Sequence, residues 1–144
     1  MFKHILLPTD GSETALRAVT RGVELAALVG AQVTVMTALE HFPSGIMGSG
    51  YRPSDDAAHT FGVKIAQERL DQAVEVARLA GVKHQQLLVR DKPVYMAIVD
   101  TAKSTGVDLI VMGTHGMGLI ERLLVGSQTQ RVLAHTSIPV LTMH

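Results

Sequence analysis

The chain has no cysteine and no tryptophan, and its other aromatic residues are two tyrosines and three phenylalanines among 144 residues. Without cysteine it can form neither a disulfide framework nor a thiolate metal site, which favours a reducing compartment. The scarcity of aromatic rings argues against a flavin site, because a flavin ring is normally flanked by aromatic side chains.

The chain also has no excess of charge of either sign, since 13 lysines and arginines balance 13 aspartates and glutamates. A neutral chain provides no large field to hold nucleic acid or an anionic membrane surface. No apolar run resembles a signal peptide or approaches the ~18 residues of a spanning helix. We therefore expect a cytoplasmic protein with no nucleic-acid partner and no membrane insertion.

Apolar patterns along the chain predict alternating strands and helices within one domain, 1–144. Strands are predicted at 5–7, 33–36, 86–89, 109–112 and 138–142, and helices at 15–26, 55–80, 93–106 and 127–135. Ser12 is placed to cap the first helix, and Gly30 to end it. Uninterrupted apolar strands between amphipathic helices predict an α/β fold with a single doubly wound, five-stranded parallel sheet and helices on both faces. Pro139 favours an edge position or a strand start for the last strand.

In such sheets, ligands bind beyond the carboxyl ends of the strands, so the segments that follow the strands are the candidate sites. Three segments stand out: 8–12, the long loop 39–54, and a glycine-rich stretch, 113–127. The loop 39–54 is either a lid or a variable connection.

The glycine-rich stretch has the spacing G-x2-G-x9-G-S, formed by Gly113, Gly116, Gly126 and Ser127. Glycines directly after a buried strand let the backbone approach a ligand, and their amides form an anion nest. Gly126 and Ser127 open the last helix, whose N-terminus favours phosphate, and the Ser127 and Thr129 hydroxyls would add donors. The pattern Ser127-x-x-Gln130 also fits a capping box that needs no ligand.

This spacing, the opening segment 3–12 and the closing segment 137–141 together resemble the universal stress protein family in its ATP-binding branch. The resemblance covers the whole length. It implies a Rossmann-like, adenine nucleotide alpha hydrolase-like fold that binds ATP, or ADP or AMP, with Mg²⁺.

Carried over position by position, the resemblance implies a set of nucleotide-binding residues. They are Pro8, Thr9, Asp10, Ala38, Met112, Gly113, Thr114, His115, Gly116, Gly126, Ser127, Gln128 and Thr129. Asp10 would also hold the nucleotide's Mg²⁺, directly or through water. Ala38 stands where valine is common, which leaves a slacker contact with the adenine.

Structural alternatives stay open for several of these residues. Asp10 could simply form a turn or assist the cap of the first helix, and His115 could face solvent rather than donate to phosphate. The other histidines lack metal-ligand spacing, so no protein-held transition metal is expected. Met36, Met96 and Met112 are predicted to fill the core.

No paired acid and base is evident for hydrolysis, and the catalytic residues stay unassigned. Arg122 could supply a positive charge or be solvated, and a Walker-type GK[ST] is missing. These features predict a nucleotide-responsive regulatory module in the stress response with at most slow ATP hydrolysis.

Two other classes remain as alternatives. Residues 9–14 after the first strand suggest a flavodoxin-like, FMN-binding electron carrier, which would leave Gly126 and Ser127 unexplained. A phosphoacceptor receiver domain would need an acidic cluster, and Asp91 is a lone acid after the third strand.

The resemblance also implies a homodimer through the last strand, in addition to a protein partner that the sequence does not identify. Ile138, Val140 and Leu141 would form an apolar edge that is a liability if left bare.

Overall fold

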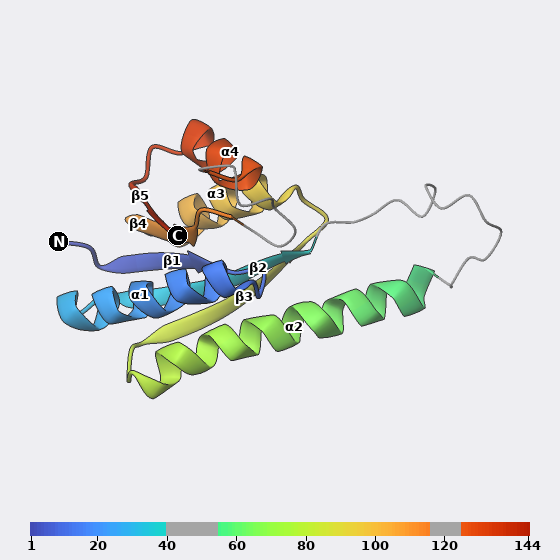
Figure 1. The fold of residues 1–144 in the computed structure, drawn as a ribbon, viewed down its shortest axis with the longest axis horizontal. Helices are drawn as coiled ribbons and strands as arrows, with labels where there is room; N and C mark the ends of the chain where they lie inside the picture. Colours follow the sequence, from blue (N-terminus) through green and yellow to red (C-terminus); the bar gives the residue numbers. More distant parts are fainter. Residues whose placement is uncertain (40–54, 116–124) are drawn as a thin grey trace.

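The computed structural model of the chain describes residues 1–39, 55–115 and 125–144. Its five strands form one parallel sheet in the order β3-β2-β1-β4-β5. The strands are β1 (His4–Pro8), β2 (Gln32–Leu39), β3 (His84–Arg90), β4 (Leu109–Gly113) and β5 (Val140–Met143). The helices are α1 (Glu13–Val29), α2 (Asp55–Leu79), α3 (Val94–Thr105) and α4 (Ser127–His135). With α1 and α2 on one face and α3 and α4 on the other (Figure 1), the predicted doubly wound α/β fold is confirmed.

The sheet separates two hydrophobic cores, and consecutive side chains of β1 alternate between them. Ile5 and Leu7 pack into the core beneath α1 and α2, whereas Leu6 joins the core beneath α3 and α4. Because successive residues of a strand point to opposite faces, a strand buried on both sides needs apolar residues throughout. This is why the apolar runs of β1 and β4 identify the centre of the sheet.

The helix ends follow the predicted capping residues. The Ser12 hydroxyl accepts a hydrogen bond from the Ala15 amide at 3.2 Å, and Gly30 ends α1 with a φ of 72°. Gly106 ends α3 in the same left-handed conformation, with a φ of 67°. Pro93, predicted inside the first turn of α3, lies one residue earlier, at its N-cap.

Strand centres match the prediction better than strand ends do. The last strand begins at Val140, two residues later than predicted, because Pro139 has no amide hydrogen and the Ile138 amide donates to the Thr136 hydroxyl. Pro139 therefore lies just before an edge strand, where its carbonyl accepts a hydrogen bond from the Ile110 amide. At the other edge, β3 is longer than predicted.

Two of the three methionines predicted to fill the core do so. Met36 and Met112 are buried, but Met96 is 40% exposed, so its prediction is wrong. The buried residues of α3 include Ala97 and Ile98, and Met96 lies on the side of the helix that turns away from the sheet.

Several predicted features fall outside the described residues: the loop after Leu39, Gly116 and Arg122. Among the helices that are described, none is long and apolar enough to cross a membrane.

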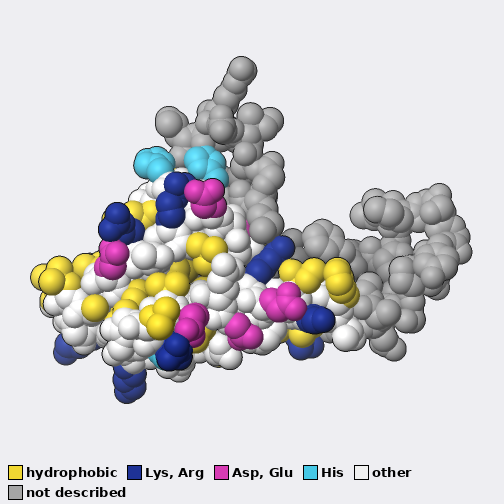
Figure 2. Space-filling view, turned by 60° about the horizontal axis from the view of Figure 1, so that its bottom comes forward, with side chains coloured by type: hydrophobic (Ala, Val, Ile, Leu, Met, Phe, Trp, Pro, Cys, Tyr) yellow, Lys and Arg dark blue, Asp and Glu magenta, His cyan; other side chains and the backbone are white. Residues whose placement is uncertain are grey.

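Charges on the face formed by α1 and α2 are mixed in sign. Figure 2 shows Lys and Arg side chains interspersed with Asp and Glu over this face. The exposed ion pairs Arg17–Glu13, Arg21–Glu24 and Arg78–Glu75 join residues three or four apart in one helix. Such exposed pairs contribute little to stability. Their mixed signs agree with the zero net charge of the sequence.

Candidate functional site

A cavity of about 480 Å³ lies at the carboxyl ends of β1, β2 and β4. The chain runs from β1 outward to β3 and then returns to β4, so the strand order reverses between β1 and β4. This is the position at which open α/β sheets bind ligands. The predicted site residues that line the cavity are Pro8, Thr9, Asp10, Ala38, Met112, Gly113, His115, Gly126, Ser127, Gln128 and Thr129. Thr114 is buried and does not line it, and Gly116 is not described.

A second hollow, of about 460 Å³, lies at the opposite end of the strands, beside their amino ends, near Lys3, Gly30 and Lys83. It adjoins the C-terminal ends of α1 and α2 and contains no residue predicted to bind a ligand. We take the carboxyl-end cavity as the candidate site because helix N-termini, which favour anions, meet there.

The turn after β1 satisfies the backbone of the α1 N-terminus by itself. Asp10 Oδ1 accepts a hydrogen bond from the Ser12 amide at 2.9 Å, and the Thr9 hydroxyl accepts one from the Gly11 amide at 3.1 Å. The turn-forming role considered for Asp10 is thus confirmed. Its role toward a ligand stays a prediction, which its place on the cavity wall allows.

Gly113 ends β4 where the strand packs closely on α1. A Cβ atom at this position would lie 3.0 Å from Thr14 Cγ2 and 3.2 Å from the Thr14 carbonyl carbon. The Thr129 hydroxyl donates to the Gly113 carbonyl at 3.0 Å. The Thr129 hydroxyl thus has a partner within the protein, and the donor role toward phosphate that the sequence suggested stays a prediction. Gly113 therefore has a packing role that needs no ligand.

The N-terminus of α4 opens on the cavity, and within the described part of the chain no side chain caps it. Its N-cap is Gly126, in extended conformation, and Ser127 is the first helical residue. The alternative of a capping box at Ser127 is therefore wrong: the Gln130 side chain donates to the Val125 carbonyl at 3.0 Å instead. The first amides of a helix have no carbonyl partner within it, and they carry the positive end of the helix dipole.

Gln128 has a structural role that the sequence did not reveal. Its Oε1 accepts a hydrogen bond from the Tyr95 amide at 3.1 Å, in the first turn of α3. Pro93, the N-cap of α3, provides no side-chain hydrogen bond. A residue of α4 therefore caps α3, although both helices also border the cavity.

The wall of the cavity beneath α3 is apolar. Met36, Ala38, Val94, Ile98 and Met112 contribute to it. Of these, Met36, Val94 and Ile98 were not predicted as site residues. They are apolar and belong to no recognisable motif, so the sequence indicates only that they are buried. A flat heteroaromatic base fits such a wall, and the polar rim suits the rest of a nucleotide.

Few charged groups line the cavity within the described part of the chain. Asp10 is the carboxylate among them, and Arg69 of α2 is the cation that sequence reasoning missed. The His115 ring lies 3.0 Å from the Thr114 hydroxyl. A metal held by one carboxylate and the oxygens of its ligand is the arrangement that Mg²⁺ accepts.

Comparison with known proteins finds similar sequences that match this chain along nearly its whole length. The model of the universal stress protein family matches residues 1–144. A universal stress protein of Thermus aquaticus, encoded in the QAH/OAS sulfhydrylase 3′ region, is 36% identical over 146 residues, which cover 98% of each chain.

Solved structures share the fold over nearly the full length. The hypothetical protein MJ0577 aligns with a TM-score of 0.84 and 26% identity, covering 99% of this chain and 96% of its own. A universal stress protein in complex with cAMP has a TM-score of 0.70 and 27% identity, with coverages of 99% and 97%. One from Archaeoglobus fulgidus in complex with dAMP has a TM-score of 0.71 and 26% identity, with coverages of 100% and 98%.

Proposed function

Because the chain belongs to the universal stress protein family, we propose that it binds an adenine nucleotide, ATP with Mg²⁺, in the cavity at the carboxyl end of the sheet. Two relatives of the same fold were solved with cAMP and with dAMP. The observation that carries the proposal is the uncapped N-terminus of α4, which opens on the same cavity as the apolar wall.

The helices α1, α3 and α4 begin at the carboxyl end of the sheet, and they differ in how the amides of their first turns are satisfied. Ser12 and Asp10 serve α1, and Gln128 serves α3. Among the described residues, no side chain serves α4, whose N-cap is Gly126. Unpaired amides at a helix N-terminus form an anion site, so the phosphate groups belong at Gly126 and Ser127.

Other residues of the cavity would bind the remaining parts of the nucleotide. Ala38 and the neighbouring apolar wall would hold the adenine, whose faces are apolar. Asp10 would hold Mg²⁺ together with phosphate oxygens, and the ion would offset phosphate charge there. Binding rather than turnover is the proposed activity, because Asp10 is the carboxylate that lines the described cavity and it already accepts a hydrogen bond from Ser12.

A nucleotide can act as a signal without being hydrolysed, by stabilising the conformation that it binds more tightly. We propose that the chain is such a regulatory module. A homodimer through β5, a protein partner and a cytoplasmic location stay predictions.

Titration calorimetry with Mg-ATP tests the proposal, with Gly126→Asp as the key variant. The φ of −70° and ψ of 160° at Gly126 suit an aspartate N-cap, which would take up the α4 amides and repel phosphate. We expect binding by the wild type and at least a hundredfold weaker binding by Gly126→Asp, with no loss of thermal stability.

Ser12→Asp is the matched control, since it adds the same charge at the N-cap of α1, where a side chain already caps the helix. We expect its affinity loss to be at least tenfold smaller. No binding by a wild-type preparation shown to be free of co-purified nucleotide would refute the proposed function.

A further inference from the structure

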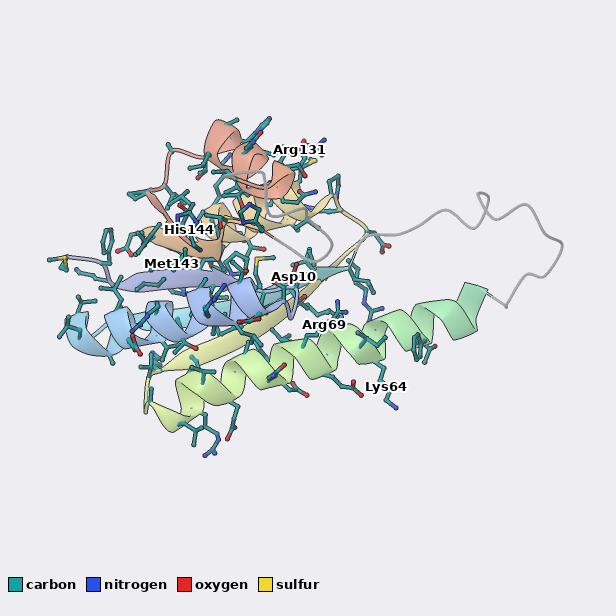
Figure 3. The ribbon with its side chains drawn as sticks, viewed as in Figure 1. Asp10, Lys64, Arg69, Arg131, Met143 and His144 are labelled. Carbon is teal, nitrogen blue, oxygen red and sulfur yellow. The ribbon has the colours of Figure 1, made fainter. Side chains whose placement is uncertain are left out.

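Arg69 reaches the cavity from α2, the helix that follows the second strand. In Figure 3 its side chain rises toward the end of β1, where Asp10 lies, whereas Lys64 of the same helix points away from the sheet. Arg69 is half-buried and lines the cavity. Among the described residues, no carboxylate forms an ion pair with it. A cation without a carboxylate partner at the wall of a cavity is ready to bind an anion.

The turn after β1 makes room for the Arg69 side chain. Gly11 has a φ of +79°, and a Cβ atom there would lie 2.6 Å from Arg69 Cγ and 2.7 Å from Arg69 Cδ. The aliphatic part of Arg69 therefore lies directly over Gly11. This packing holds the guanidinium beside the Asp10 turn, so that less side-chain entropy is lost when it binds a ligand.

The α4 N-terminus and Arg69 approach the cavity from opposite faces of the sheet, because α4 packs with α3 and Arg69 belongs to α2 (Figure 1). A single phosphate at Gly126 and Ser127 is served by backbone amides. A longer phosphate chain would extend across the carboxyl end of the sheet toward Asp10 and the Mg²⁺ proposed there, and each added phosphate would bring further negative charge. A guanidinium on this side would offset part of that charge and can bind phosphate oxygens in pairs.

We propose that Arg69 binds the phosphate groups of the nucleotide beyond the first, and so makes the cavity select nucleoside di- and triphosphates over monophosphates. This assignment rests on the proposed function. It adds to that function a residue that determines which adenine nucleotide occupies the site.

The test compares AMP and ATP binding, each with the same excess of Mg²⁺ and at one ionic strength. Arg69→Met keeps the aliphatic packing on Gly11 but removes the charge. We expect it to weaken ATP binding about tenfold or more, the loss typical of a hydrogen bond to a charged group, and to change AMP binding by less than about twofold.

Two further variants complete the set. Lys64→Met removes a cation from the same helix outside the cavity, and it should leave both affinities unchanged. Arg69→Lys keeps the charge without the paired donors and should recover part of the ATP affinity. Melting temperatures of all variants verify folding; if Arg69→Met does not fold, the ratio of ATP to AMP affinity in Arg69→Lys decides the question.

The possible failures are distinct. A wild-type chain that binds neither AMP nor ATP overturns the proposed function and this assignment with it. Wild-type binding that Arg69→Met weakens equally for AMP and ATP, or weakens for neither, overturns only the assignment of Arg69.

Discussion

Replacement of Gly113 by alanine should destabilise the protein even when no nucleotide is present. The added Cβ would meet Thr14 Cγ2 at 3.0 Å, the Thr14 carbonyl carbon at 3.2 Å and the Ala15 nitrogen at 3.3 Å. The last two atoms belong to the backbone of the first turn of α1, so they cannot rotate away. Overpacking of this kind costs about 1–3 kcal/mol, from which the lower unfolded-state entropy of alanine recovers roughly 0.5–1 kcal/mol.

Urea unfolding of the nucleotide-free protein measures this effect, for which we expect a net loss of about 0.5–2 kcal/mol. Gly62→Ala is the control: it lies within α2, and among the described residues its Cβ would meet only Leu39 Cδ1 and Cδ2, at 3.6 and 3.8 Å. It should stabilise the protein by roughly 0.5–1 kcal/mol. A Gly113→Ala variant as stable as the wild type, but unable to bind nucleotide, would refute the packing argument and assign Gly113 to the ligand.

The remaining predictions concern stability. Gln128→Ala should cost about 1 kcal/mol, because the Tyr95 amide loses its acceptor; unfolding by urea and faster hydrogen exchange at the Tyr95 amide check this. Burial lowers the pKa of His4 below its ordinary value of 6.5, although the negative charge of Asp108 opposes the shift. The unfolded chain therefore binds more protons below pH 6.5, so the free energy of unfolding should fall as the pH drops from 6.5 toward the folded pKa, and this contribution should be constant above 6.5. In a His4→Gln variant, the free energy of unfolding should change less steeply between pH 5 and 7 than in the wild type. An equally steep pH dependence in both proteins would contradict this role of His4.

The centres of the strands and helices could be predicted from the sequence, because burial on both sides of the sheet demands apolar runs that few other structures need. The ends of the strands depend on hydrogen bonds between distant residues. The start of β5 is set by Pro139 and by the hydrogen bond from the Ile138 amide to Thr136. No periodic pattern encodes such bonds, so the boundaries were less accurate.

The parts of the cavity that come from local motifs were predictable: the turn after β1 and the segment that opens α4. The contributions of α2 and α3 were not. Arg69 reaches the cavity only because α2 packs beside the Gly11 turn, and Gln128 caps α3 only because α4 lies against it. Each is a relation between elements far apart in the sequence, and neither residue differs locally from an ordinary polar residue of an amphipathic helix.

The same hydrogen bonds that shape the cavity connect it to the sheet edge proposed for dimerisation. The Gly126 amide donates to the Thr114 carbonyl at 2.6 Å, and the Thr114 amide donates to the Met143 carbonyl of β5 at 2.7 Å. A phosphate bound at the α4 N-terminus would therefore lie on the segment that is hydrogen-bonded to Thr114, and Thr114 is in turn hydrogen-bonded to the edge strand β5. If the dimer forms through β5, any change in dimer affinity caused by the nucleotide must be matched by an equal change in nucleotide affinity caused by dimerisation. The short path from Gly126 to Met143 is a physical reason to expect that coupling in a chain whose proposed role is to respond to a nucleotide rather than to consume it.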